Sequence, residues 1–154
     1  MFDAVNDNFY GAKEYIQRVG VKNVTKEEWE DISKHIYKMP IIFIADYACY
    51  LNWFYITQNQ YLDESTIEKY HFLVYWQFVA KHQRLSESFM EKFANFLNWE
   101  DVSLYQEMSV EFIKKHMNKL NIEMVQKNDN CGIHLHSQYV VHKTGELLKK
   151  EIIL

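Results

Sequence analysis

The chain has 154 residues, a length typical of one domain, and its 48% hydrophobic and 25% charged residues allow a packed core. Four glycines and one proline are too few for the many turns of a β-sandwich or barrel, so a mostly helical fold is expected. A net charge of −4 argues against a general nucleic-acid coat, which would show a basic excess.

Cysteine content and the absence of obvious sorting segments favour a cytoplasmic protein. Cys49 and Cys131 lie far apart in the sequence and suggest no disulfide framework, which favours a reducing compartment. The N-terminus lacks the basic start and apolar run of a signal peptide. The apolar segment 39–56 carries Asp46 and Asn52 and is barely long enough to span a bilayer. We therefore predict no membrane partner.

The first predicted element is a helix over residues 3–19, which Gly20 ends. Thr25 and Glu28 form a capping box that opens the next helix. We expect one domain, 1–154, in which residues 1–24 form an N-terminal capping helix, residues 25–127 helical repeats and residues 128–154 a C-terminal hairpin or tail.

A repeat of 23 residues follows. Trp53, Trp76 and Trp99 are each 23 residues apart, and Trp29 precedes Trp53 by one residue more. An aliphatic residue comes three positions after each tryptophan, and a small or polar residue comes next. The aliphatic column is Ile32, Ile56, Val79, Val102 and, in the partial last repeat, Val125; the small or polar column is Ser33, Thr57, Ala80 and Ser103.

A column of capping residues divides each repeat into two helices. Asp63, Ser86 and Ser109 occupy it in three repeats, and Pro40 occupies it in the first. Asp and Ser accept hydrogen bonds from the free N–H groups of a first helical turn, and proline suits the first helical position. We predict a first helix of roughly two turns and a second of roughly three. One continuous helix per repeat is the alternative, because no glycine marks the turn.

Helices this short persist only by stacking on neighbours, so the predicted fold is mainly α, with helix–turn–helix repeats stacked as a small solenoid or bundle. The apolar segment 41–51 is then the second helix of the first repeat, expected to be the most buried helix, with Asp46 on its outer face. The C-terminal segment alternates partly, and the stretch 143–146 resembles a hairpin turn. A last helix from Gly145 onward is the alternative.

The repeat resembles the short tryptophan-containing tandem helical repeat of proteins from large DNA viruses and some bacteriophages. Residues 76–121 match it best, through the pattern W-x-x-[IV]-[SA]-x-x-Q-x-[LM]-S-x-x-F-[IM]-x-K-x-x-x-x-L-N. It covers about two-thirds of the chain. The first repeat departs from it, with Pro40 at the cap and one inserted residue. The resemblance implies an α-helical repeat fold, a viral or phage origin and no catalytic residues.

Several residue sets invite a chemical function, and each has a structural interpretation. Cys131, His134, His136 and His142 include zinc-type ligands, but C-x-x-H-x-H lacks the paired spacing of a zinc finger, so we predict no metal and no other cofactor. His35 and His82 occupy the same repeat column, but no Ser, Asp or Cys is placed beside either histidine to form a catalytic triad.

The glutamine that recurs seven residues after the tryptophan is expected to satisfy backbone groups at the turn; the alternative is a binding face. This column holds Gln60, Gln83 and Gln106.

The variable positions on and after the first helices are the better candidates for function, because a repeat stack presents them as one extended surface. The candidate protein-binding residues are Phe54, Tyr55, Gln77, Lys81, His82, Arg84, Glu100, Asp101 and Tyr105.

We predict a non-enzymatic protein-interaction protein. It would act as an inhibitor or adaptor of a host protein or complex, an anti-CRISPR-like or other anti-defence role if the viral resemblance holds. The alternatives are a nucleic-acid- or nucleotide-binding regulator with a C-terminal zinc site and, last, a small hydrolase that uses the histidines. Nucleic acid is not the favoured partner, and homo-oligomerisation is left open.

Overall fold

The computed structural model describes residues 8–131, 139–141 and 147–149, and the described part is mainly α-helical, as predicted. Two compact units make up the chain, unit 1 (Met1–Tyr75) and unit 2 (Trp76–Leu154). Within the described residues, no helix is long and apolar enough to cross a bilayer.

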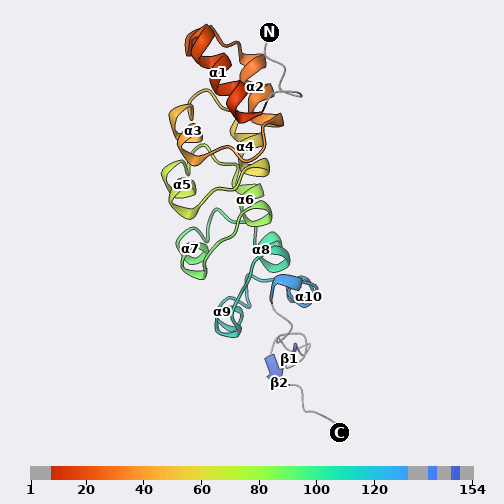
Figure 1. Ribbon diagram of the computed structural model, residues 1–154. Coiled ribbons are helices and arrows are strands. Elements are labelled where there is room, and N and C mark those ends of the chain that lie inside the picture. The colour runs from red at the N-terminus through yellow and green to blue at the C-terminus, as the bar shows by residue number, and fades with distance from the viewer. Residues whose placement is uncertain (1–7, 132–138, 142–146, 150–154) are drawn as a thin grey trace. The chain divides into compact units, whose positions relative to one another are not determined.

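Unit 1 contains the N-terminal helix and the first two repeats. Its second helices, α3 and α5, lie in one row, and its first helices, α2 and α4, pack in another (Figure 1). The helix α1 covers this pair of repeats from one end, where the Phe9 ring meets the Phe43 ring edge-on at 5.1 Å. The elements are α1 (Phe9–Val19), η1 (Val21–Asn23), α2 (Lys26–His35), α3 (Ile41–Asp46), α4 (Trp53–Asn59) and α5 (Glu64–Lys69).

Unit 2 repeats the arrangement. The first helices α6, α8 and α10 pack side by side, and α7 and α9 form the second row (Figure 1). The elements are α6 (Trp76–His82), α7 (Glu87–Lys92), α8 (Trp99–Tyr105), α9 (Val110–Lys115), α10 (Ile122–Gln126), η2 (Asp129–Cys131), β1 (Tyr139–Val141) and β2 (Leu147–Lys149).

The aliphatic column forms the core of both units. Ile32, Ile56, Val79 and Val102 are all fully buried. Removing one such side chain from water is worth about 2 kcal/mol. The predicted aliphatic column is therefore part of the hydrophobic core of each unit.

The tryptophans pack in a similar way, but the buried indole N–H of Trp29 has no hydrogen-bond partner among the described residues. Each packs against rings near the end of its own second helix: Trp29 stacks on Tyr50 at 5.2 Å, and Trp76 stacks on Phe93 at 5.1 Å. The indole N–H of Trp53 donates to the Ala48 carbonyl at 2.8 Å, and that of Trp99 donates to the equivalent Ala94 carbonyl at the same distance. The indole thus ties each of these repeats to the one before it.

The helix caps confirm that each full repeat contains two helices. Asp63, Ser86 and Ser109 accept from the backbone N–H three residues ahead, and Thr25 with Glu28 forms the predicted capping box. Pro40 differs from the prediction: it is the N-cap residue, and α3 begins at Ile41. Its ψ of 141° is extended, so it cannot be a helical residue.

The second helices are shorter than predicted. Each of α5, α7 and α9 has six residues, after which the chain enters a turn. In α5 the turn forms because Leu73 and Val74 both donate to the Tyr70 carbonyl. The apolar residues that follow the helix therefore belong to this turn and not to a longer helix.

The helix α3 is not the most buried helix. It buries only Phe43 and Ile44, the two positions that the other second helices also bury, while Ile42 is 71% exposed. Asp46 is exposed, as expected for the outer face. The apolar character of this segment therefore reflects exposed as well as buried side chains.

Two short strands end the described chain. The strand β1 pairs antiparallel with β2, with Tyr139 opposite Lys149. The predicted turn at 143–146 lies outside the described residues, so the hairpin as a whole stays a prediction.

Candidate functional site

The recurring glutamines face inward and fasten successive turns together. Gln60 is buried; its side-chain carbonyl accepts from the Met39 N–H at 2.8 Å, and its side-chain amide donates to the Ile36 carbonyl at 2.6 Å. In unit 2, Gln106 accepts from the Leu85 N–H at 3.0 Å and donates to the Gln83 carbonyl at 2.7 Å. The predicted turn role is confirmed, and the turn that each glutamine stabilises belongs to the preceding repeat.

The small polar column has a linking role that the sequence did not reveal. The hydroxyl of Ser33 donates to the Trp29 carbonyl at 2.7 Å and accepts from the Asn52 N–H at 2.8 Å. Ser103 makes the same two bonds, to the Trp99 carbonyl and from the Asn121 N–H. Each hydroxyl therefore binds the start of the next repeat to the first helix of its own repeat.

Asn128 closes the last repeat in place of a glutamine. It is fully buried, and its side-chain amide donates to the Ser103 carbonyl at 3.0 Å and the Gln106 carbonyl at 2.8 Å. The thiol of Cys131 also lies 3.4 Å from the Gln106 carbonyl, and burial is the main cause of its raised pKa. This cysteine is therefore part of the end of the stack.

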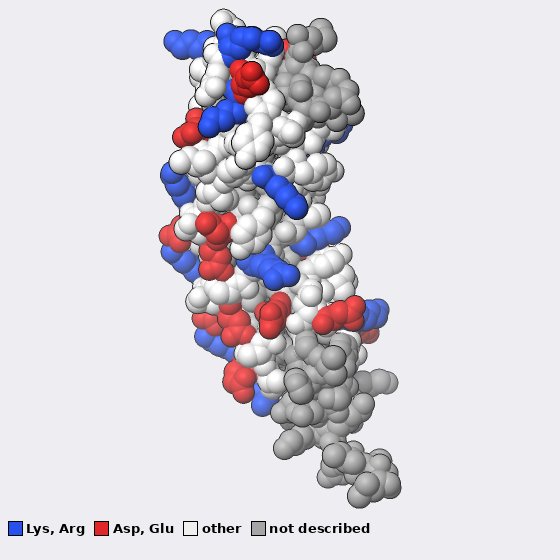
Figure 2. All heavy atoms as spheres, in the orientation of Figure 1, with Lys and Arg blue, Asp and Glu red and all other residues white. Residues whose placement is uncertain are grey.

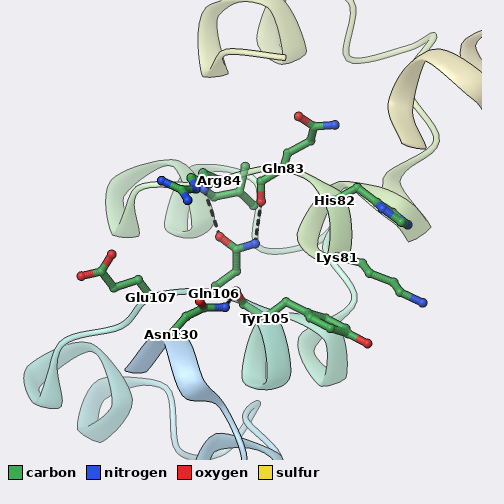
Figure 3. Close-up of a pocket in the computed structure, with 9 residues that line it drawn as sticks. Lys81, His82, Gln83, Arg84, Tyr105, Gln106, Glu107 and Asn130 are labelled. Carbon is green, nitrogen blue, oxygen red and sulfur yellow. Dashed lines mark hydrogen bonds between the residues drawn. The ribbon is translucent and has the colours of Figure 1, made fainter. Parts of the chain in front are cut away.

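Four of the predicted binding residues line one pocket of about 440 Å³ in unit 2. Lys81, His82 and Arg84 come from the end of α6 and its turn, and Tyr105 comes from the end of α8 (Figure 3). Gln106 lies between them: Lys81, His82 and Tyr105 extend to one side of it, and Arg84 and Glu107 extend to the other (Figure 3). The remaining lining residues are Gln83, Leu85 and Asn130.

The charges of this pocket are mixed. The Lys81 ammonium lies 5.7 Å from the centre of the Tyr105 ring, in cation–π range. Partial burial, with a smaller contribution from Lys81, lowers the pKa of His82, which favours the neutral imidazole. The guanidinium of Arg84 makes no ion pair with the described residues, so its charge is open to a partner.

The other predicted residues lie apart from this pocket. Gln77 and Glu100 are exposed, and Asp101 is half-buried, in the first turns of α6 and α8. Phe54 and Tyr55 belong to unit 1, where both are half-buried and their rings meet edge-on at 5.1 Å. The predicted set is thus divided between the two units.

Two exposed tyrosines were missed. Tyr37 is 73% exposed and Tyr61 is 68% exposed, each in the turn between the two helices of its repeat. Arg84 and Glu107 hold the same column in unit 2. Tyr61, Arg84 and Glu107 each follow the recurring glutamine, and Tyr37 follows Ile36, which takes the place of the glutamine in the first repeat. That position could have been found: if the glutamine points inward at a turn, the residue beside it projects outward.

The metal interpretation cannot be followed beyond Cys131, because His134, His136 and His142 lie outside the described residues. Among the described residues, no group of three or more His, Cys, Asp or Glu side chains could hold a metal ion. His35 lies 3.9 Å from Asp31 of the same helix, a contact within one helix face.

Comparison of the chain with family models, curated proteins and solved structures finds no match. The viral and phage resemblance of the repeat therefore stays a prediction.

Proposed function

We propose that the protein is a non-enzymatic binding protein that docks on a partner protein through the outward residues of its first helices and their turns. It acts as an inhibitor or adaptor, and an anti-defence role against a host complex follows if the chain is viral or phage-encoded. The pocket around Arg84 in unit 2 is the docking site.

The supporting observation is that recurring and variable positions of the repeat have different roles. The recurring polar groups (capping hydroxyls, glutamine amides and the indole N–H groups of Trp53 and Trp99) make hydrogen bonds inside the fold. The variable positions beside them carry Lys81, Arg84 and Tyr105, which project outward (Figure 3). Arg and Tyr are frequent interface anchors, and a repeat scaffold usually binds through its variable positions.

The surface charge also supports a protein partner over nucleic acid. On the face shown in Figure 2, the Lys and Arg atoms of the described residues are interspersed with Asp and Glu atoms, and neither unit shows a continuous basic stripe. A nucleic-acid surface relies on such a stripe to neutralise phosphates. Mixed charge suits the polar rim of a protein interface.

Affinity capture from host lysate with paired charge reversals tests this function. Arg84→Glu is expected to weaken retention of the specific partner about tenfold or more, because a central arginine often contributes 2 kcal/mol or more to an interface. The matched control is Lys114→Glu, an exposed reversal on α9, away from the pocket. The control should retain the partner, and far-ultraviolet circular dichroism should show unchanged helix content in both variants.

Recovery of nucleic acid alone would contradict the proposal. So would the finding that Arg84→Glu and Lys114→Glu retain the captured proteins equally well.

A further inference from the structure

The tyrosines of unit 1 differ in the contacts that their side chains make. Most of those whose side chains are described contact another ring, a cation or a carboxylate: Tyr55 has Phe54 and Lys34, and Tyr70 has Trp53 and Lys69. Among the described residues, Tyr37 and Tyr61 make no ring, cation–π or side-chain hydrogen-bond contact. These two rings, which we call the tyrosine pair, are exposed and make none of these contacts among the described residues.

Buried hydrogen bonds fix the backbone beneath the tyrosine pair. Gln60 bonds to the Ile36 carbonyl and the Met39 N–H, on either side of Tyr37, and Gln60 itself precedes Tyr61. The two turns are thus fastened to each other. A tyrosine on a fixed backbone has only two side-chain torsions to order, so binding through it costs little conformational entropy.

The segment that carries the tyrosine pair has an excess of acidic residues. Residues 29–75, which form the two repeats that carry the pair, hold six Asp and Glu but only three Lys and no Arg. Unit 1 accounts for the whole net charge of −4, because the acidic and basic residues of 76–154 are equal in number. A net negative charge attracts cations and repels phosphate over long range.

Rings in this unit already bind cations. The Lys69 ammonium lies 5.0 Å from the Tyr70 ring centre, the Arg18 guanidinium 5.6 Å from that of Tyr15, and the Lys34 ammonium 5.9 Å from that of Tyr55. The tyrosine pair offers the same electron-rich faces without an internal cation. A cation supplied from outside is the complementary ligand.

We propose that the tyrosine pair, Tyr37 with Tyr61, is a docking element for an arginine- or lysine-bearing segment of a partner protein. The inference rests on the proposed function and adds a second contact site, in unit 1, with a defined partner chemistry. A cationic side chain lies against the two ring faces, and the acidic background of unit 1 adds long-range attraction.

A fluorescent peptide of alternating glycine and arginine serves as the probe, in a titration with the full chain followed by anisotropy. Tyr37→Ser with Tyr61→Ser is expected to weaken binding about tenfold, since two exposed cation–π contacts are lost. Tyr37→Phe with Tyr61→Phe keeps the ring faces and should stay within about twofold of the unchanged chain. A peptide with neutral citrulline in place of arginine should not bind.

The control double variant, Ile42→Ser with Phe72→Ser, removes two other exposed apolar side chains of unit 1. It should bind the arginine peptide as the unchanged chain does. The inference would be overturned by no binding of the arginine peptide to the unchanged chain, by equal binding of the citrulline peptide, or by unweakened binding by the serine variant. Tighter binding of a single-stranded oligonucleotide than of the peptide would also overturn it.

The outcome is separable from that of the proposed function. If Arg84→Glu loses a captured protein while the serine variant of the tyrosine pair keeps it, the docking function stands and only this inference fails. If no captured protein depends on Arg84, the docking function itself fails, whatever the peptide titration shows.

Discussion

At the residue scale, the buried glutamine satisfies several backbone groups at once. One side chain, Gln106, satisfies three backbone groups of the preceding repeat, at Ala80, Gln83 and Leu85. A buried backbone group without a partner costs about 1–3 kcal/mol. This demand explains why a residue with both a donor and an acceptor recurs where the turn requires both.

Gln106→Ala is expected to lower the free energy of unfolding by about 3 kcal/mol, because those groups lose their partner. Urea unfolding followed by circular dichroism measures the change. The control is Gln126→Ala, at an exposed position of α10, with an expected change below about 0.5 kcal/mol. Equal losses in the two variants would mean that the buried bonds contribute nothing specific.

Strain is also visible at this scale. Lys38 is the extra residue of the first repeat, and it adopts a φ of 56°, in the left-handed region that non-glycine residues rarely enter. Met39 can thereby still enter the buried column that Leu62 occupies in the next repeat. The insertion was evident in the sequence, but the residue that absorbs it was not.

At the scale of the element, caps decide where each helix begins. The carboxylate of Asp63 accepts from the Thr66 N–H at 2.7 Å and the Ser65 hydroxyl at 2.9 Å. Hydrogen bonding by Thr66 is the main cause that lowers the pKa of Asp63 below its ordinary value of 3.8. The folded protein therefore prefers the ionised cap.

Asp63→Asn separates the charge of this cap from its hydrogen bond. A carboxylate with a lowered folded pKa stabilises the protein above its unfolded pKa, and this stability is lost as the pH falls through the folded value. The stability advantage of the unchanged chain over the variant should therefore shrink below about pH 3.8. Urea unfolding at a series of pH values measures it.

The comparison variant for this prediction is Ser86→Ala, which removes a cap that does not titrate, at an expected cost of about 1 kcal/mol. Its cost should not vary with pH in the same way. A constant difference between the unchanged chain and Asp63→Asn down to pH 2.5 would contradict the role given to the carboxylate.

At the scale of the whole molecule, the repeats supply one another with a core. Helices of six or seven residues are far below the length of about 12–15 at which isolated helices become marginal in water. Their stability comes from the aliphatic column and from bonds that join residues 18–26 positions apart. The repeat is therefore a unit of structure but not an independently folding one.

A synthetic peptide of residues 76–98, one complete repeat, should show little helical circular dichroism in water. The full chain, measured under the same conditions, should show the strong helical spectrum of the fold. A helical peptide spectrum would contradict the view that neighbouring repeats supply the missing interior.

The sequence by itself determined the period, the two helices per repeat, the caps and the buried aliphatic column, because these depend on local spacing and capping chemistry. It also indicated the inward glutamines through their recurrence. Only the tertiary structure decided which groups those glutamines and hydroxyls bind, where the second helices end and which aromatic residues stay exposed. Tyr37 and Tyr61 are aromatic, yet each follows a buried residue at a turn, Ile36 or Gln60, and is itself exposed. The physical reason is that the local periodicity of the sequence does not reveal a hydrogen-bond partner that lies one repeat away.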